Sequence, residues 1–183
     1  MMLGDSIVND TSSSCWELLL GRMYPRCTIT KITSVRGSTG CWWYKEENRV
    51  LNYVVTYKPD LLIIGGISNH DDTESIRDVI TQVRASINPE IMLMTGPFGT
   101  YDPTTDPNWS DTVTPNGHGY RSRLMKLAQE EDAEFLDMTG VWGKYLRECG
   151  KPRLWCMRDS VHANDRGFQI LGRILEAYFR PTQ

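Results

Sequence analysis

The chain has 183 residues, of which 40% are hydrophobic and 23% are charged, as in a soluble globular protein, and this length predicts one domain over residues 1–183. Twenty Lys and Arg against 23 Asp and Glu give a net charge of −3, which excludes nucleic acid as the main partner because duplex binders carry a basic excess. The longest apolar run, Leu61 to Ile67, is far shorter than the ~20 residues of a membrane span, and no signal peptide is recognisable, so no membrane partner is expected.

The expected strands are short and apolar. In Asp60–Gly66 every central position is apolar, which is typical of a strand covered on both faces in a parallel sheet. Ile91–Gly96 repeats this pattern, and the other strands are shorter or alternate. In chain order, we expect strands just before Gly4 and over Cys27–Val35, Asp60–Gly66, Ile91–Gly96 and Glu134–Met138.

Helical patterns lie between these strands. The clearest begins at Thr73, a residue able to cap a helix, and places Ile76, Val79, Ile80 and Val83 on one face. The expected helices are Ser12–Met23, Glu46–Tyr57, Thr73–Ile87, Gly119–Glu131 and Asn164–Phe179.

The alternation of strands and helices predicts an α/β protein, namely a three-layer α/β/α sandwich around a flavodoxin-like parallel five-stranded sheet. Ligands of such sheets bind beyond the carboxyl ends of the strands. The long connection Pro97–Gly117 leaves one of these ends, and loops of this length are usually functional or disordered. The strand ends to consider are Gly4–Ser6, Val35–Gly40, Gly65–Asn69 and Gly96–Phe98.

The amino end is short for a strand. Only three residues precede Gly4, whereas strands usually have five or six. We therefore expect a domain excised from a longer chain, and the missing signal peptide leaves the compartment open.

Cysteine and histidine give no pattern of a metal site. The five cysteines are an odd number without a C-x-x-C pair, so no disulfide framework is predicted, although one bridge such as Cys149–Cys156 stays open. His70, His118 and His162 lie far apart and lack zinc-binding spacing, so no metal is predicted.

One serine and one histidine have the right surroundings for nucleophilic catalysis. A serine needs a base, and a histidine base needs an acceptor that fixes its tautomer. Only His162 has such a partner at short spacing, Asp159, just before a helix that Asn164 or Asp165 would cap. Ser6 follows the first strand in a Gly-Asp-Ser triplet, which would otherwise be a plain helix-capping turn.

Two further strand ends offer hydrogen-bond donors for an oxyanion. Gly40 can present a backbone N–H without a side chain in the way, and Asn69 can present an amide. Gly37 is the alternative to Gly40.

Together these residues resemble the SGNH hydrolases, also called GDSL esterases and lipases, over nearly the whole chain. The resemblance implies that Ser6 is the nucleophile and also an oxyanion donor through its backbone N–H. It implies that Asp159 and His162 complete the triad, and that Gly40 and Asn69 complete the oxyanion hole. No cofactor is implied, and the family makes a secreted or periplasmic location plausible.

The chain departs from this family at one block. Where the family has the pattern G-x-N-D, this chain has Gly66-Ile67-Ser68-Asn69-His70. Asn69 is therefore displaced by one residue, and His70 stands in place of the Asp. Ser68 is an alternative to Asn69 as the oxyanion donor. The G-x-S-x-G elbow of the α/β-hydrolases is absent from the sequence.

Tryptophans near the strand ends suggest the substrate. Aromatic rings among polar residues suit the apolar face of a sugar, and the polar Pro97–Gly117 loop is unlike a lipase lid. The resemblance is greatest to bacterial carbohydrate acetylesterases, which would remove acetyl groups from acetylated xylan or another plant polysaccharide through an acyl-serine. The alternatives are a thioesterase or lipase-like esterase, and a non-catalytic carbohydrate-binding module. The candidate substrate-binding residues are Trp42, Trp43, His70, Trp109 and Trp155.

Overall fold

The structure, a computed structural model, describes residues 1–66, 70–97 and 102–181. In this part of the chain the strands pair side by side and all in parallel, in the order β2-β1-β3-β4-β5. This is the flavodoxin-like order, and with helices on both faces it confirms the predicted α/β/α sandwich. The strands are β1 (Met2–Gly4), β2 (Thr33–Val35), β3 (Leu61–Ile64), β4 (Glu90–Met94) and β5 (Glu134–Leu136).

Both faces of the sheet are buried because successive strand residues point to opposite sides. Met2 and Ile63 contribute to one hydrophobic core, while their neighbours Leu3 and Ile64 contribute to the other. All four side chains are at most 2% exposed. The continuous apolar runs seen in the sequence are therefore explained by a sheet between two helical layers.

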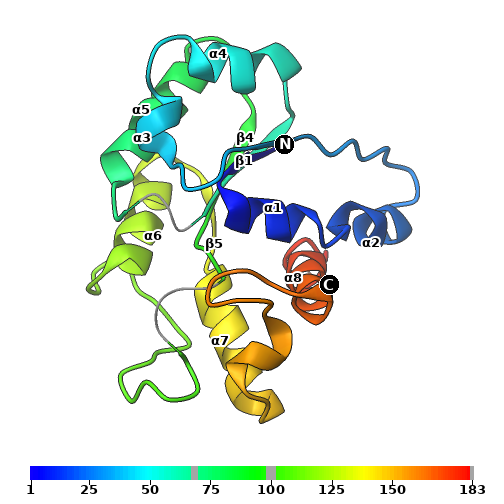
Figure 1. Ribbon diagram of the computed structural model, residues 1–183. Helices are drawn as coiled ribbons and strands as arrows, with labels where there is room; N and C mark the ends of the chain where they lie inside the picture. Colours follow the sequence, from blue (N-terminus) through cyan, green and yellow to red (C-terminus); the bar gives the residue numbers. More distant parts are fainter. Residues whose placement is uncertain (67–69, 98–101, 182–183) are drawn as a thin grey trace.

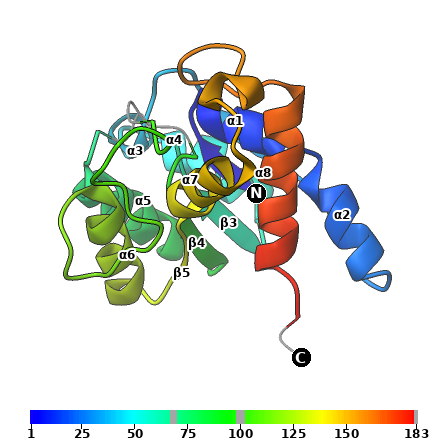
Figure 2. The same ribbon diagram turned by 90° about the horizontal axis from the view of Figure 1, so that it is seen from below.

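Each core is closed by its own set of helices (Figures 1 and 2). On the Met2 side lie α1 (Ser6–Ser12), α2 (Trp16–Met23), α7 (Met138–Cys149), the 3-10 helix η2 (Arg153–Cys156) and α8 (Asp165–Tyr178). On the Leu3 side lie α3 (Cys41–Tyr44), α4 (Arg49–Tyr53), the 3-10 helix η1 (Val55–Tyr57), α5 (Thr73–Arg84) and α6 (Tyr120–Glu130).

Several expected boundaries are wrong. The helix expected over Ser12–Met23 begins only at Trp16, because Ser12 ends α1 and Cys15 adopts a left-handed backbone, with φ of 53°, between the two helices. The strand expected over Cys27–Val35 is confined to Thr33–Val35, and the helix expected over Glu46–Tyr57 is divided into α4 and η1.

Two helices differ further from the sequence prediction. The cap of α5 is Asp72 rather than Thr73, since the Asp72 carboxylate accepts the N–H of Ser75 at 2.9 Å. The sequence reasoning missed α7 altogether and assigned its first residue, Met138, to a strand.

The order of the sheet reverses beside β1, because the chain places β2 on one side of it and β3 on the other. Loops that leave β1 and β3 therefore diverge, and the space between them is where flavodoxin-like sheets bind ligands. Ser6 lies two residues after the end of β1, where the loops after β1 and β3 diverge.

Candidate active site

Ser6 is the first residue of α1, and its neighbour Asp5 caps that helix. The buried Asp5 carboxylate accepts the N–H groups of Ile7 at 2.9 Å and Val8 at 3.4 Å. Asp5 is thus the residue of the Gly-Asp-Ser triplet that caps the helix, and the Ser6 hydroxyl contacts His162 instead.

The turn that carries Ser6 is packed too tightly for side chains at two glycines. A Cβ at Gly4 would lie 2.4 Å from the carbonyl oxygen of Gly65 and 2.5 Å from Val8. Gly66 has φ of +109°, and a Cβ there would lie 2.5 Å from the Asp5 carboxylate. Close approach of β1 and β3 therefore fixes the position of Ser6.

The structure brings Ser6, Asp159 and His162 together although 156 positions separate Ser6 from His162. The His162 Nε2 lies 3.0 Å from the Ser6 Oγ, and its Nδ1 lies 3.0 and 2.9 Å from the two carboxylate oxygens of Asp159. Ser6 and the His162 side chain are both partly exposed to solvent.

Asp159 is held as an anion by N–H donors. The backbone N–H of Val161 and that of His162 each donate to its Oδ1 at 2.8 Å. The Val161 hydrogen bond, followed by those from His162, lowers the pKa of Asp159 from 3.8 to about 2. At neutral pH the carboxylate is thus ionised and can accept a hydrogen bond from the Nδ1–H group of His162, which leaves Nε2 to accept a hydrogen bond from the Ser6 hydroxyl.

The loop that carries Asp159 and His162 closes on itself. The N–H of Arg158 donates to the His162 carbonyl at 3.0 Å, and Met157 and Ala163 form an antiparallel bridge. Asn164 caps α8, since its Oδ1 accepts from Arg166 at 3.0 Å, as the sequence allowed.

The sequence reasoning missed two residues here: Asp10 of α1 accepts the N–H of Ala163 in this loop, and Arg158 of the loop lies 3.4 Å from Asp10. The one available signal was that Asp10 follows Ser6 by four residues, a spacing that puts two side chains on one face of a helix.

The candidate oxyanion donors are described only in part. Gly40 is buried at the start of α3, whereas its alternative Gly37 is exposed. Asn69 and its alternative Ser68 lie outside the described residues. His70 is described, and it is exposed with φ of +49°.

The tryptophans that follow Gly40 differ in their surroundings. The Trp42 side chain is 40% exposed. Trp43 has the guanidinium groups of Arg36 and Arg49 over its ring at 4.6 and 4.2 Å, and it contacts the Tyr44 ring. Trp43 is therefore engaged within the protein, and Trp42 offers more surface to a ligand.

Trp109 packs onto helix α7. A Cβ at Gly143 would lie 2.1 Å from its ring, its Nε1 donates to Asp111 at 3.1 Å, and the Arg121 guanidinium lies 5.3 Å from the ring centre. These contacts give Trp109 a packing role.

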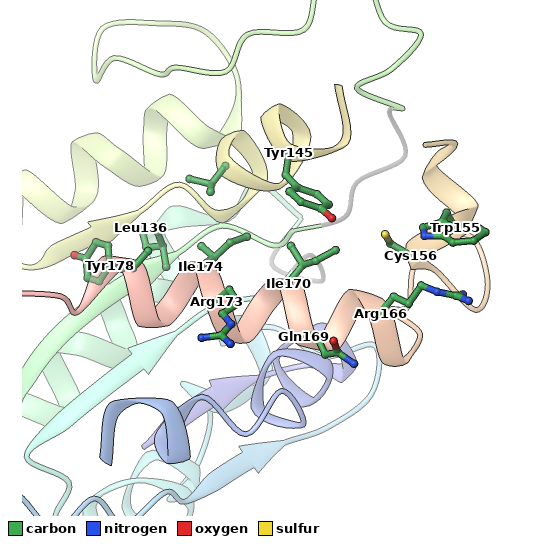
Figure 3. Close-up of a pocket in the computed structure, with 12 residues that line it drawn as sticks. Leu136, Tyr145, Trp155, Cys156, Arg166, Gln169, Ile170, Arg173, Ile174 and Tyr178 are labelled. Carbon is green, nitrogen blue, oxygen red and sulfur yellow. The ribbon is translucent and has the colours of Figure 1, made fainter. Parts of the chain in front are cut away.

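Trp155 lines a groove whose lining residues do not include Ser6 (Figure 3). This groove of about 670 Å³ runs along α8, with Trp155 and Arg166 at one end and Tyr178 at the other. Its lining is Leu136, Val141, Tyr145, Trp155, Cys156, Arg166, Gln169, Ile170, Arg173, Ile174, Ala177 and Tyr178, so Ser6 and His162 do not take part.

Other kinds of site were sought in the described part of the chain. None of the five cysteines is in a disulfide, so Cys149 and Cys156 form no bridge. No cluster of three or more His, Cys, Asp or Glu side chains there could hold a metal ion. No helix there is long and apolar enough to cross a membrane.

Comparison with solved structures finds the same architecture in esterases of low sequence identity. An acetyl-xylooligosaccharide esterase mutant from Geobacillus stearothermophilus matches all of this chain over 94% of its own length, with 20% identity and a TM-score of 0.73. An acetyl xylan esterase, AlAXEase, matches 98% of this chain over its whole length, with 16% identity and a TM-score of 0.67.

The chain has the fold of these acetyl xylan esterases. A Bacillus subtilis protein also matches 94% of it, with 22% identity and a TM-score of 0.68, and this chain spans about half, 53%, of that longer protein. No protein-family model and no curated protein matches the sequence.

Proposed function

We propose that this chain is an SGNH-type serine esterase that removes small acyl groups, acetyl above all, from a carbohydrate such as acetylated xylan. The observation that carries the proposal is the Ser6–His162–Asp159 chain of contacts, in which each neighbouring pair of side chains lies within about 3 Å. Nucleophile, base and orienting carboxylate are the parts that a serine hydrolase requires.

The first half of the reaction uses the two nitrogens of His162. As Ser6 Oγ attacks the ester carbonyl carbon, Nε2 takes the hydroxyl proton, and the ionised Asp159 stabilises the imidazolium through Nδ1. The carbonyl electron pair moves to its oxygen, and we assign the Ser6 and Gly40 backbone N–H groups and the Asn69 amide to that oxyanion. His162 then gives its proton to the departing sugar oxygen, which leaves acetyl-Ser6.

The second half regenerates the enzyme. His162 takes a proton from a water molecule, which attacks the acetyl carbonyl, and acetate leaves as Ser6 recovers its proton. Besides the ester and the water molecule, the proposed steps use side-chain and backbone groups of this chain.

Two observations support a carbohydrate ester over a lipid ester. The solved proteins that share this fold include acetyl xylan and acetyl-xylooligosaccharide esterases. Residues 102–117, the described part of the loop after β4, are mostly exposed and polar. A loop that covers a lipid substrate would instead present a strongly hydrophobic surface.

Replacement of the nucleophile and of the base tests the proposal. In Ser6→Ala and His162→Ala we expect kcat for acetate release from acetylated xylan to fall on the order of 10⁶-fold, because these groups act as a unit. Ser13→Ala and His118→Ala, which change exposed residues outside the site, are the matched controls and should keep full activity.

A fluorophosphonate probe separates the remaining classes. Labelling of Ser6 in the parent but not in Ser6→Ala supports an esterase, and faster turnover of long-chain acyl esters or thioesters than of acetylated xylan would reassign the substrate. If either alanine variant keeps more than a tenth of the activity, the assignment of nucleophile and base is wrong. A folded parent that neither labels nor hydrolyses would be a binding module.

A further inference from the structure

Asp10 is a buried carboxylate on α1, one helical turn after Ser6. Its side chain is only 1% exposed, and the spacing of four residues places it on the same face of the helix as Ser6. Burial of a carboxylate is costly unless its oxygens are hydrogen-bonded or paired with a cation. The partners of Asp10 therefore indicate why this position holds an acid.

Both partners of Asp10 belong to the loop that carries the base. Its Oδ2 accepts the backbone N–H of Ala163, the residue after His162, at 2.8 Å. Its Oδ1 lies 3.4 Å from Nη2 of Arg158, the residue before Asp159. Asp10 thus holds the loop at both of its ends.

Among the residues that the structure describes, other hydrogen bonds of this loop lie within it or lead to η2 and α8. The Arg158–His162 bond and the Met157–Ala163 bridge close the loop upon itself, and the Asn164 side chain ties it to η2 and α8. Beside the Ser6–His162 contact, the contacts of Asp10 with Ala163 and Arg158 join α1 to this loop.

We propose that Asp10 is a positioning residue, which fixes the His162 Nε2 against the Ser6 Oγ, with Arg158 as its counter-ion. This inference rests on the proposed esterase function. Misplacement of a reacting group by about 1 Å can cost on the order of 10²-fold in rate, so an anchor on the same helical face as the nucleophile has a large effect on kcat.

The charges around Asp10 suit an anchor. Burial raises its pKa, while the Ala163 N–H and the Arg158 guanidinium oppose that rise, and His162 and Asp159 are the other titratable groups that act on it. Arg158 is about half exposed and also lies 3.9 Å from Asp159, so it pairs with both acids of this region.

The test compares kcat and KM in three variants. Asp10→Asn keeps an oxygen for the Ala163 N–H but loses the charge, Asp10→Ala loses both, and Arg158→Gln removes the counter-ion. We expect kcat for acetyl-ester hydrolysis to fall about tenfold in Asp10→Asn and about hundredfold in Asp10→Ala, with KM within twofold of the parent and a smaller loss in Arg158→Gln.

The matched control is Glu131→Gln. Glu131 is also a mostly buried acid, with Arg77 and Arg84 as partners, but it lies between the end of α6 and the edge strand β5. We expect it to lower the melting temperature without changing kcat. An unchanged kcat in folded Asp10→Ala would overturn the proposal, and so would a loss of kcat in Glu131→Gln equal to that in Asp10→Ala. If Asp10→Ala fails to fold, an unchanged kcat in Asp10→Asn would overturn the proposal instead.

Amide hydrogen exchange separates this inference from the proposed function. If the parent has no esterase activity, the proposed function fails, and the backbone N–H groups of Val161 and His162, which contact Asp159 rather than Asp10, still report on the loop. Exchange at both amides at least tenfold faster in the Asp10 variants than in Glu131→Gln supports an anchor, and unchanged exchange contradicts it.

Discussion

Asp159 links the arrangement of the site to the pH dependence of stability. Its pKa is about 2 in the folded protein and 3.8 without the fold, so the folded state favours the ionised form. The contribution to the free energy of unfolding is therefore fully present above about pH 4 and is lost as the pH falls through 2.

We predict that the difference in melting temperature between the parent and Asp159→Asn is constant from pH 7 to about pH 4 and decreases from there toward pH 2. The difference is measured because the pKa of Asp10 is raised, so that Asp10 changes the stability with pH in the opposite direction to Asp159. Asp10 is present in both proteins, and its contribution is therefore largely removed by the subtraction. Thermal unfolding followed by circular dichroism gives it directly. A difference that persists undiminished at pH 2 would contradict the assigned role of the N–H donors.

Short motifs, together with the family resemblance, predicted Ser6, Asp159 and His162 as a triad, and the structure places these three side chains in contact. They could not select Asp10, whose role depends on the fold that places α1 beside a loop about 150 residues further along the chain. For Trp109, the sequence predicted a position near a strand end and a contact with substrate. The structure shows that its ring packs on Gly143, which the sequence could not indicate.

At the scale of elements, the close contact of β1 with β3 sets the position of the serine. We predict that Gly4→Ala lowers the free energy of unfolding by about 1–3 kcal/mol, because the new methyl group would overlap the Gly65 carbonyl and Val8. It should also slow fluorophosphonate labelling of Ser6, which follows two residues later.

Gly21→Ala is the control for that substitution. Gly21 lies inside α2 with no heavy atom near the position of an added Cβ, so alanine should raise stability by about 0.5–1 kcal/mol through its better helix propensity and leave labelling unchanged. Denaturant unfolding measures both effects, and equal stabilities of the two variants would refute the packing argument.

Periodicity identified the elements that bury a regular face and failed for the others. The four apolar residues of α5 recur at helical spacing, and all are buried as predicted. Helix α7 escaped prediction because Gly140 and Gly143 interrupt its pattern, although both glycines are needed for close packing against Asp137 and Trp109. Helix α3 has only four residues, too few to show a period.

At the scale of the molecule, one sheet separates two cores, and we propose that they unfold together as a single domain. Ile63 and Ile64 are adjacent and buried on opposite faces, so Ile63→Ala and Ile64→Ala each remove packing from one core. We expect each to cost about 2–5 kcal/mol and to leave a single cooperative transition by fluorescence and circular dichroism. Two separate transitions in either variant would show that the layers are independent.

The reactive serine belongs to the first helix and its partner imidazole to the segment just before the last one. Because ribosomes make proteins amino end first, the Ser6 alcohol is made 156 positions before the imidazole of His162. Under the proposed function, a polypeptide that ends before His162 would have no esterase activity, and activity would require the final helix to dock against the first two.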